Sequence, residues 1–332
     1  MNEFRPHPLL RSGHLQTVIG ALYPGSLPQY HAEQRVVPLA DGERMVVHEE
    51  HAPHLKPDAP VMILVHGLGG DHTSPYLRRI ASKLIKIECR AWRIDLRGCG
   101  AGLEHAYRPA HAGSSDDLAH VAAEAQRVYP HADIVIAAFS LGGNILLKML
   151  GEAALGELTV DLSLDRLKLA LAVAPPSDLH GCSANMERFS RMPYTRYYLK
   201  MLAKQVDIRA AKWDAWRSIV STAQPRTIRE FDALYTAPLS GFRDTDHYYT
   251  ASSSSRLLTA IRTKTLLLID RDDPIIPSAT LEGAAVSDHV TKIVTRHGGH
   301  LGYLARRPRS ARIHRWMDDW VIEQVQRLSR LQ

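Results

Sequence analysis

Apolar and polar residues along this chain form two alternating patterns. Apolar runs typical of strands buried on both faces of a sheet cover residues 61–65, 134–139 and, interrupted only by Lys168, 167–174. A further strand is expected near residues 92–96. Helical spacing of apolar residues follows most of these runs. In the helix expected from Pro75, with Ser74 as its cap, the buried stripe would be Leu77, Ile80, Ala81 and Leu84. The alternation predicts an α/β fold with a mainly parallel sheet covered by helices on both faces.

Two segments depart from this alternation. Residues 35–39 and 45–50, joined through the turn signal Asp41-Gly42, predict an antiparallel hairpin at the start of the sheet. Between about residues 178 and 262 the chain becomes helical in pattern and rich in aromatic residues. We therefore expect one core made of residues 1–177 and 263–332, with residues 178–262 inserted as a helical cap. Most of its aromatic side chains are expected to pack the cap onto the core.

The sequence AFSLGGN, residues 138–144, places a serine between a strand and a helix. In a nucleophile elbow, such a tight turn exposes the serine Oγ at the carboxyl edge of a parallel sheet, beside the positive end of the helix dipole. The usual motif is G-x-S-x-G, and Ala138 replaces its first glycine. We predict that Ser140 is a nucleophile. The alternative is an ordinary Ser-Leu-Gly-Gly turn.

A second segment, VMILVHGLGG at residues 61–70, ends a buried strand in a glycine-rich loop. In an α/β-hydrolase this loop presents a backbone N–H to the developing oxyanion, and the residue after the nucleophile presents another. We predict Leu68 and Leu141 as these two donors. His66 is expected to support the loop.

A third segment carries an acidic pair and two histidines in the chain order of a hydrolase triad. Asp272 and Asp273 follow the strand at residues 265–269, and only one of them can orient a catalytic histidine. Because Pro274 restricts the preceding residue to extended geometry, we predict Asp273 as the acid, with Asp272 facing solvent or bracing the loop. His300 is the predicted base, and His297 is expected to brace the loop.

Together these segments resemble the YheT-like branch of the α/β-hydrolases, over nearly the whole length of the chain. Further marks of the resemblance are SGHLQT at 12–17, SPY at 74–76, DLRGCG at 95–100 and REFD at 229–232. The resemblance implies an α/β-hydrolase fold and a carboxylesterase or lipase activity on acyl esters. It also implies Ser140 as nucleophile, His300 as general base and Asp273 as acid.

The expected reaction is two-step acyl transfer to water through an acyl-enzyme. The substrate would be a small-molecule acyl ester, and neither a metal nor an organic cofactor is implied; the chain lacks both G-x-G-x-x-G and P-loop fingerprints. The same triad could also cleave thioesters or amides, or pass the acyl group to another acceptor. A hydrolase-fold protein that binds without turnover is a weaker alternative, because no triad member is missing.

The composition of the chain indicates the size of its core and the compartment in which we expect the protein. At 332 residues and 45% hydrophobic content, the chain can form one large core. Its three cysteines are too scattered for a disulfide framework, which favours a reducing compartment. We find neither a signal-peptide pattern nor an apolar run long enough to span a membrane, and expect a cytoplasmic protein. Its oligomeric state is left open.

Charge and histidine content suggest two further functions, and we reject both. The net charge is +6, with arginines gathered at the start of the last predicted helix, at residues 306, 307, 309, 312 and 315. We interpret them as a solvated helix surface, expect no nucleic-acid partner, and leave open a weak contact with anionic lipid. His48, His51 and His54 lack the helical spacing of a zinc site, so we expect ordinary surface histidines.

Overall fold

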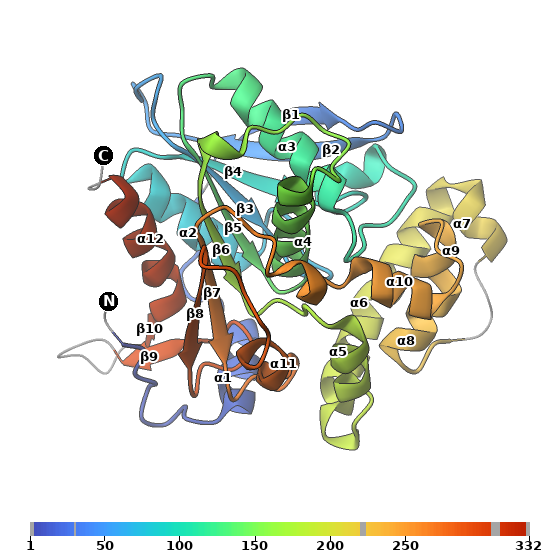
Figure 1. The fold of residues 1–332 in the computed structure, drawn as a ribbon. Coiled ribbons are helices and arrows are strands. Elements are labelled where there is room, and N and C mark those ends of the chain that lie inside the picture. The colour runs from blue at the N-terminus through green and yellow to red at the C-terminus, as the bar shows by residue number, and fades with distance from the viewer. Residues whose placement is uncertain (1–2, 30, 220–223, 307–312, 330–332) are drawn as a thin grey trace.

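A computed structural model describes residues 3–29, 31–219, 224–306 and 313–329 (Figure 1). Within them, one sheet has the strand order β1-β2-β4-β3-β5-β6-β7-β8. Its strands are β1 Glu33–Pro38, β2 Arg44–Glu50, β3 Val61–Val65, β4 Arg90–Asp95, β5 Ile134–Phe139, β6 Leu167–Val173, β7 Thr265–Asp270 and β8 Val290–Thr295. The pairs β1–β2 and β2–β4 are antiparallel, and the remaining neighbours are parallel. The predicted hairpin and mainly parallel sheet are confirmed.

Successive residues of the central strands enter two separate cores. In β5, Ile134, Ile136 and Ala138 belong to one apolar cluster, and the alternate residues Val135, Ala137 and Phe139 belong to the other. Helices α3 (Ser115–Val128) and α4 (Leu141–Leu155) cover the first face, while α2 (Pro75–Ile85) and α12 (Trp316–Ser329) cover the second. This burial on both faces explains why the strands are continuous apolar runs.

Helix α2 has the predicted buried stripe, Leu77, Ile80, Ala81 and Leu84. Ser74 occupies the N-cap position without making a side-chain cap bond. Its Oγ instead accepts a hydrogen bond from the Asp71 amide at 3.3 Å, within the preceding loop.

Between β6 and β7 the chain forms a group of helices to one side of the sheet (Figure 1). They are α5 Leu179–Met186, α6 Met192–Lys212, α7 Asp214–Ile219, α8 Ile228–Phe231, α9 Ala237–Leu239 and α10 Thr245–Ser252, with short 3₁₀ and π turns between some of them. A further short helix, α11 (Ser278–Glu282), follows β7. None of the described helices is both long and apolar enough to cross a membrane.

The arginine-rich segment differs from its prediction. Residues Leu304–Arg306 (β9) and Ile313–Arg315 (β10) pair antiparallel, so the last helix begins only at Trp316. Arg315 is partly buried: its guanidinium donates to the carbonyls of Gly20 and Tyr23 at the end of α1 (Gly13–Leu22). The solvated-surface interpretation is therefore wrong for Arg315. Arg307, Arg309 and Arg312 lie outside the described residues.

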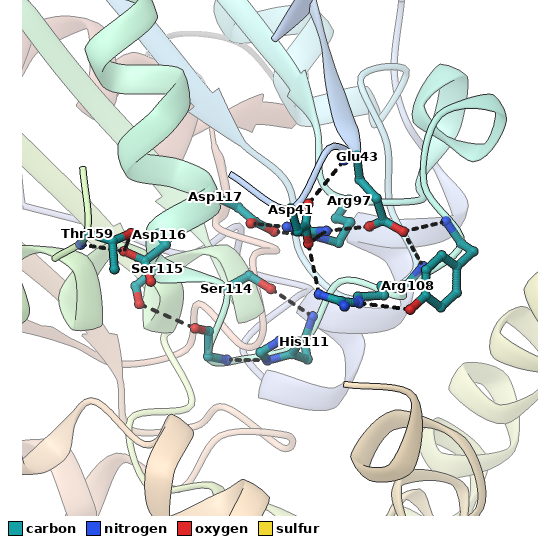
Figure 2. A network of polar contacts seen from close by, with 12 residues as sticks. Asp41, Glu43, Arg97, Arg108, His111, Ser114, Ser115, Asp116, Asp117 and Thr159 are labelled. Carbon is teal, nitrogen blue, oxygen red and sulfur yellow. Dashed lines mark hydrogen bonds and ion pairs between the residues drawn. The ribbon is translucent and has the colours of Figure 1, made fainter. Parts of the chain in front are cut away.

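A buried ion-pair network holds the loop after β4 in place (Figure 2). The Arg97 guanidinium makes a bidentate contact with Asp117 of α3, at 2.8 and 2.6 Å. It also donates to Asp41, at 2.6 Å, and to Glu43, both from the β1–β2 turn. One cation thus joins the hairpin, α3 and the β4 loop.

Arg97→Met should strongly destabilise the protein, because it leaves buried Asp117 and partly buried Glu43 without their counter-charge. The expected loss in free energy of unfolding is about 3–5 kcal/mol, measured by urea denaturation at pH 7. Arg127→Met, which breaks an exposed pair with Glu124, is the control and should change little. Equal effects of the two variants would contradict the structural role of the Arg97 network.

Candidate active site

Ser140 lies at a sharp turn between β5 and α4. Its backbone has φ +52° and ψ −122°, a conformation that an L-residue adopts only under strong local constraint. Its amide donates to the Val173 carbonyl of β6 at 2.8 Å, and a side chain at Gly142 would come within 2.5 Å of the His66 carbonyl. Ala138, which replaces the usual elbow glycine, is fully buried in β5, and the turn forms around it.

The structure brings the three predicted triad residues together. The Ser140 Oγ lies 3.0 Å from His300 Nε2, and His300 Nδ1 lies 2.8 Å from Asp273 Oδ2. All three side chains are buried. The other Asp273 oxygen accepts hydrogen bonds from the amides of Ile275 and Ile276, at 2.8 and 2.9 Å, which fixes the carboxylate facing the imidazole.

The neighbouring acid points elsewhere. Asp272 pairs with His297 at 2.8 Å, and the same His297 nitrogen lies 2.7 Å from the Arg11 carbonyl. Asp272 and His297 therefore connect the two loops that carry Asp273 and His300 to the N-terminal segment.

The predicted oxyanion donors lie beside Ser140. A Cβ on Gly67 would be 3.0 Å from the Ser140 Cβ, so the loop after β3 contacts the serine directly. Leu141 begins α4, and in the described part of the chain neither the Leu68 nor the Leu141 amide has an intramolecular acceptor. Both N–H groups are thus free to bind an oxygen.

His66 connects this loop to β4. Its Nε2 accepts a hydrogen bond from the Leu96 amide at 3.1 Å, which places the proton on Nδ1, 2.7 Å from the Gly67 carbonyl. Burial lowers the pKa of His66, so the ring is neutral.

Residues that the sequence analysis did not single out hold the His300 loop. The Thr17 hydroxyl accepts a hydrogen bond from the His300 amide at 2.9 Å, and buried Asp270 accepts from the amides of Gly298 and Gly299. Gln16, fully buried, bonds to both the amide and the carbonyl of Leu304. The available signals in the sequence were Asp270, the first acid of DRDD at residues 270–273, and the SGHLQT segment, but neither indicates a partner.

One histidine prediction is wrong. His51 and His54 are exposed, whereas His48 is buried, 2.9 Å from Asp95 and stacked on His72 with ring centroids 3.4 Å apart. Burial acts to raise the pKa of Asp95, but hydrogen bonds from the two histidines hold it well below its usual range. Among the described residues this is the one His/Cys/Asp/Glu cluster close enough to hold a metal. Its parallel rings suit hydrogen bonding to the carboxylate better than tetrahedral coordination.

Two cavities meet at Ser140. A cavity of about 140 Å³ lies between the serine and helices α5, α6 and α8. A cleft of about 710 Å³ on the other side is bounded by α1, the start of α2 and the first half of α6, and it includes His300. The side chains of Leu68 and Tyr198 line both.

Comparisons with known proteins agree with this geometry. The family model described as "Alpha/beta hydrolase family" matches residues 62–312. The chain belongs to the α/β-hydrolase family.

Two similar proteins are named as an esterase and a lipase. The chain is 30% identical over 309 residues to "Putative esterase YheT" of Escherichia coli (strain K12), covering 91% of this chain and 87% of that protein. It is 25% identical to a monoacylglycerol lipase of Saccharomyces cerevisiae, covering 75% of this chain but only 56% of the yeast protein. The resemblance to the YheT-like branch is therefore confirmed.

Solved structures show the same fold. An esterase of Pyrococcus furiosus matches 92% of this chain and 95% of its own, with a TM-score of 0.58 at 15% identity. An esterase of Thermogutta terrifontis matches 90% and 99%, with a TM-score of 0.52 at 17% identity. The predicted α/β-hydrolase fold is confirmed.

A buried acid lines the smaller cavity of this α/β-hydrolase. Asp232 accepts a hydrogen bond from the Tyr249 hydroxyl at 2.8 Å. Burial nonetheless raises the pKa of Asp232 to about 6. Between pH 4 and 6 the folded protein therefore keeps a proton that the unfolded chain has released, so this group lowers stability as pH rises.

Asp232→Asn should remove this pH-dependent loss. Its free energy of unfolding, relative to wild type, should increase by up to about 3 kcal/mol between pH 4 and pH 7, measured by urea denaturation. Asp214→Asn, an exposed change in the same segment, should follow the wild-type profile. A constant difference between Asp232→Asn and wild type across this range would rule out a buried titrating Asp232.

Proposed function

We propose that this α/β-hydrolase cleaves carboxylic acyl esters, with Ser140, His300 and Asp273 as its catalytic triad. The observation that carries the proposal is the hydrogen-bonded chain from Ser140 Oγ through His300 to Asp273, at 3.0 and 2.8 Å, with the serine on a strained strand–helix turn. Family relatives named esterase and lipase support the same class of reaction.

In the proposed mechanism, His300 Nε2 takes the Ser140 proton as Oγ attacks the ester carbonyl carbon. The Asp273 carboxylate accepts a hydrogen bond from the Nδ1–H group of His300 and stabilises the imidazolium. The N–H groups of Leu68 and Leu141 bind the tetrahedral oxyanion, each contributing about 3 kcal/mol. The imidazolium then protonates the leaving alcohol, and water activated by His300 releases the acid from the serine.

The helical insertion, residues 178–262, is proposed as a cap over this site. Tyr198 and Met201 of α6 line the larger cleft, and α5, α6 and α8 line the smaller cavity. The cap would exclude water from the acyl-enzyme and shape the space for substrate.

We also propose a reducing compartment such as the cytoplasm as the location of the protein. All three cysteines are buried and none forms a disulfide, which fits such a compartment.

Acyl transfer to an alcohol is a second candidate. One relative, 24% identical over 305 residues, is named "Medium-chain fatty acid ethyl ester synthase/esterase 2". Adding ethanol to the assay and separating ester from acid among the products distinguishes transfer from hydrolysis.

Ser140→Ala should abolish both turnover and covalent labelling. A fluorophosphonate should label wild-type protein on Ser140, and the variant should lose the label and about a million-fold in kcat for 4-nitrophenyl hexanoate. Ser163→Ala, at an exposed serine, should be labelled like wild type. Full labelling of the Ser140→Ala variant would show that Ser140 is not the nucleophile.

Asp273→Asn should lower kcat by about ten-thousand-fold while leaving the thermal midpoint nearly unchanged, because asparagine favours the wrong histidine tautomer. Asp272→Asn is the matched control, since its carboxylate pairs with His297 instead. A large loss in the Asp272 variant with a near-normal Asp273 variant would show that the acid is Asp272.

A further inference from the structure

The smaller cavity beside Ser140 contains a buried cation. Arg209, in the last turns of α6, lines this cavity and is only 2% exposed. Its guanidinium lies over the Trp216 ring at 5.0 Å. It donates to the Gly98 carbonyl at 2.5 Å and to Gln205 at 3.2 Å, while its Nε–H has no acceptor.

No ion pair joins Arg209 to a carboxylate in the part of the chain that the structure describes. Among the other buried arginines, Arg97 contacts three carboxylates and Arg93 pairs with Glu50. Arg90 donates to the carbonyls of Ala59 and Lys56. A buried charge without a counter-charge is costly, and burial accordingly lowers the pKa of Arg209. Arginine nevertheless stays protonated in proteins, so the cavity retains its positive charge.

The other titratable groups around the cavity do not offset this charge well. Burial lowers the pKa values of His66 and His111, the latter to about 3, so both rings are neutral. Burial raises the pKa of Cys99, beside Arg209, to about 11, so its thiol is neutral too. Asp232 is the one carboxyl group lining the cavity among the described residues. With its pKa raised to about 6 it is mostly ionised at pH 7, but its hydrogen bond is to Tyr249 and it forms no ion pair with Arg209.

The core fixes the position of this cation. Gly98, whose carbonyl accepts from Arg209, follows Arg97 directly in the chain, and Arg97 is anchored by Asp41, Glu43 and Asp117 (Figure 2). The Arg209 guanidinium is therefore held by the core as well as by its own helix. A fixed, poorly hydrated cation discriminates well between a charged and a neutral ligand group.

We propose that this cavity receives an acyl group whose far end carries a carboxylate, bound by the Arg209 guanidinium. The inference rests on the proposed ester hydrolysis at Ser140 and names the substrate class. The acyl half is assigned to the smaller cavity because it stays bonded to Ser140 after the alcohol has left, and the larger cleft offers the alcohol a way out. Chemistry at the serine is unchanged: the carboxylate takes no part in bond making or breaking.

The test compares matched pairs of 4-nitrophenyl esters. Mono-esters of succinate, glutarate, adipate and pimelate are each paired with the methyl-ended ester of the same chain length, from butanoate to heptanoate. For at least one length, wild-type kcat/KM should favour the carboxylate by about tenfold or more. Arg209→Met should reverse this preference, and Arg209→Lys should keep part of it. Lys212 also lies on α6, but it pairs with Glu104, so Lys212→Met removes a cation of the same helix and should behave as wild type.

A wild-type measurement makes the test independent of variant folding. Adipate should inhibit hydrolysis of 4-nitrophenyl hexanoate about tenfold more strongly than hexanoate does. A second pair, 4-carboxyphenyl and 4-methylphenyl hexanoate, places the carboxylate on the alcohol, where no preference is expected.

Three results would overturn the inference: a wild-type preference for the methyl-ended ester at every length, an equal effect of Arg209→Met on both members of each pair, or a preference confined to the alcohol side. An equal effect would mean that Arg209 only connects the cap to Gly98. If wild type hydrolyses neither series and Ser140 takes no fluorophosphonate label, the proposed function itself fails. Turnover of methyl-ended esters without a carboxylate preference leaves that function standing and removes only this inference.

Discussion

The backbone of Ser140 is held at positive φ where β5 meets α4, and the geometry of the site depends on this constraint. The turn is maintained by packing on both sides. The amide of Ser140 bonds to β6, and α4 approaches the end of β3 so closely that Gly142 has no room for a side chain. Strain of this kind persists only where the surrounding structure over-determines it. The two apolar cores, one on each face of the sheet, supply that rigidity, since β3, β5 and β6 are buried on both faces.

The remaining parts of the site reach the serine from distant parts of the chain. Asp270 and Thr17 hold the backbone of the His300 loop, and the Asp273 carboxylate is held by amides of its own loop. Each contact is a hydrogen bond between a side chain and a backbone amide. Such bonds fix an orientation in a loop that secondary structure does not control. The N-terminal helix α1 thus helps to hold the proposed triad, although it contributes no residue to it.

Buried charges in this molecule fall into two kinds. Arg97 and Asp95 are surrounded by opposite charges or hydrogen-bond donors and connect neighbouring loops. Arg209 and Asp232, in the cavity beside Ser140, lack such complete compensation, and their pKa values shift toward the neutral form. Uncompensated charge lowers stability, so its concentration at one cavity favours a role in ligand binding over a role in folding.

The sequence by itself determined the α/β layering, the turn at Ser140 and the chain order of the proposed acid and base, because these depend on local periodicity and short motifs. Ala138 illustrates the limit of motif matching, since the elbow forms without its usual glycine. Only the tertiary structure decided that Asp273 faces His300 while Asp272 faces His297, that His48 is buried against Asp95, and that Arg315 packs on α1. It also decided that Arg209 has no carboxylate partner among the described residues. Adjacent residues of a loop can point to opposite partners, and charged side chains find partners far away in sequence. Those choices are made by packing between elements, which the local pattern does not encode.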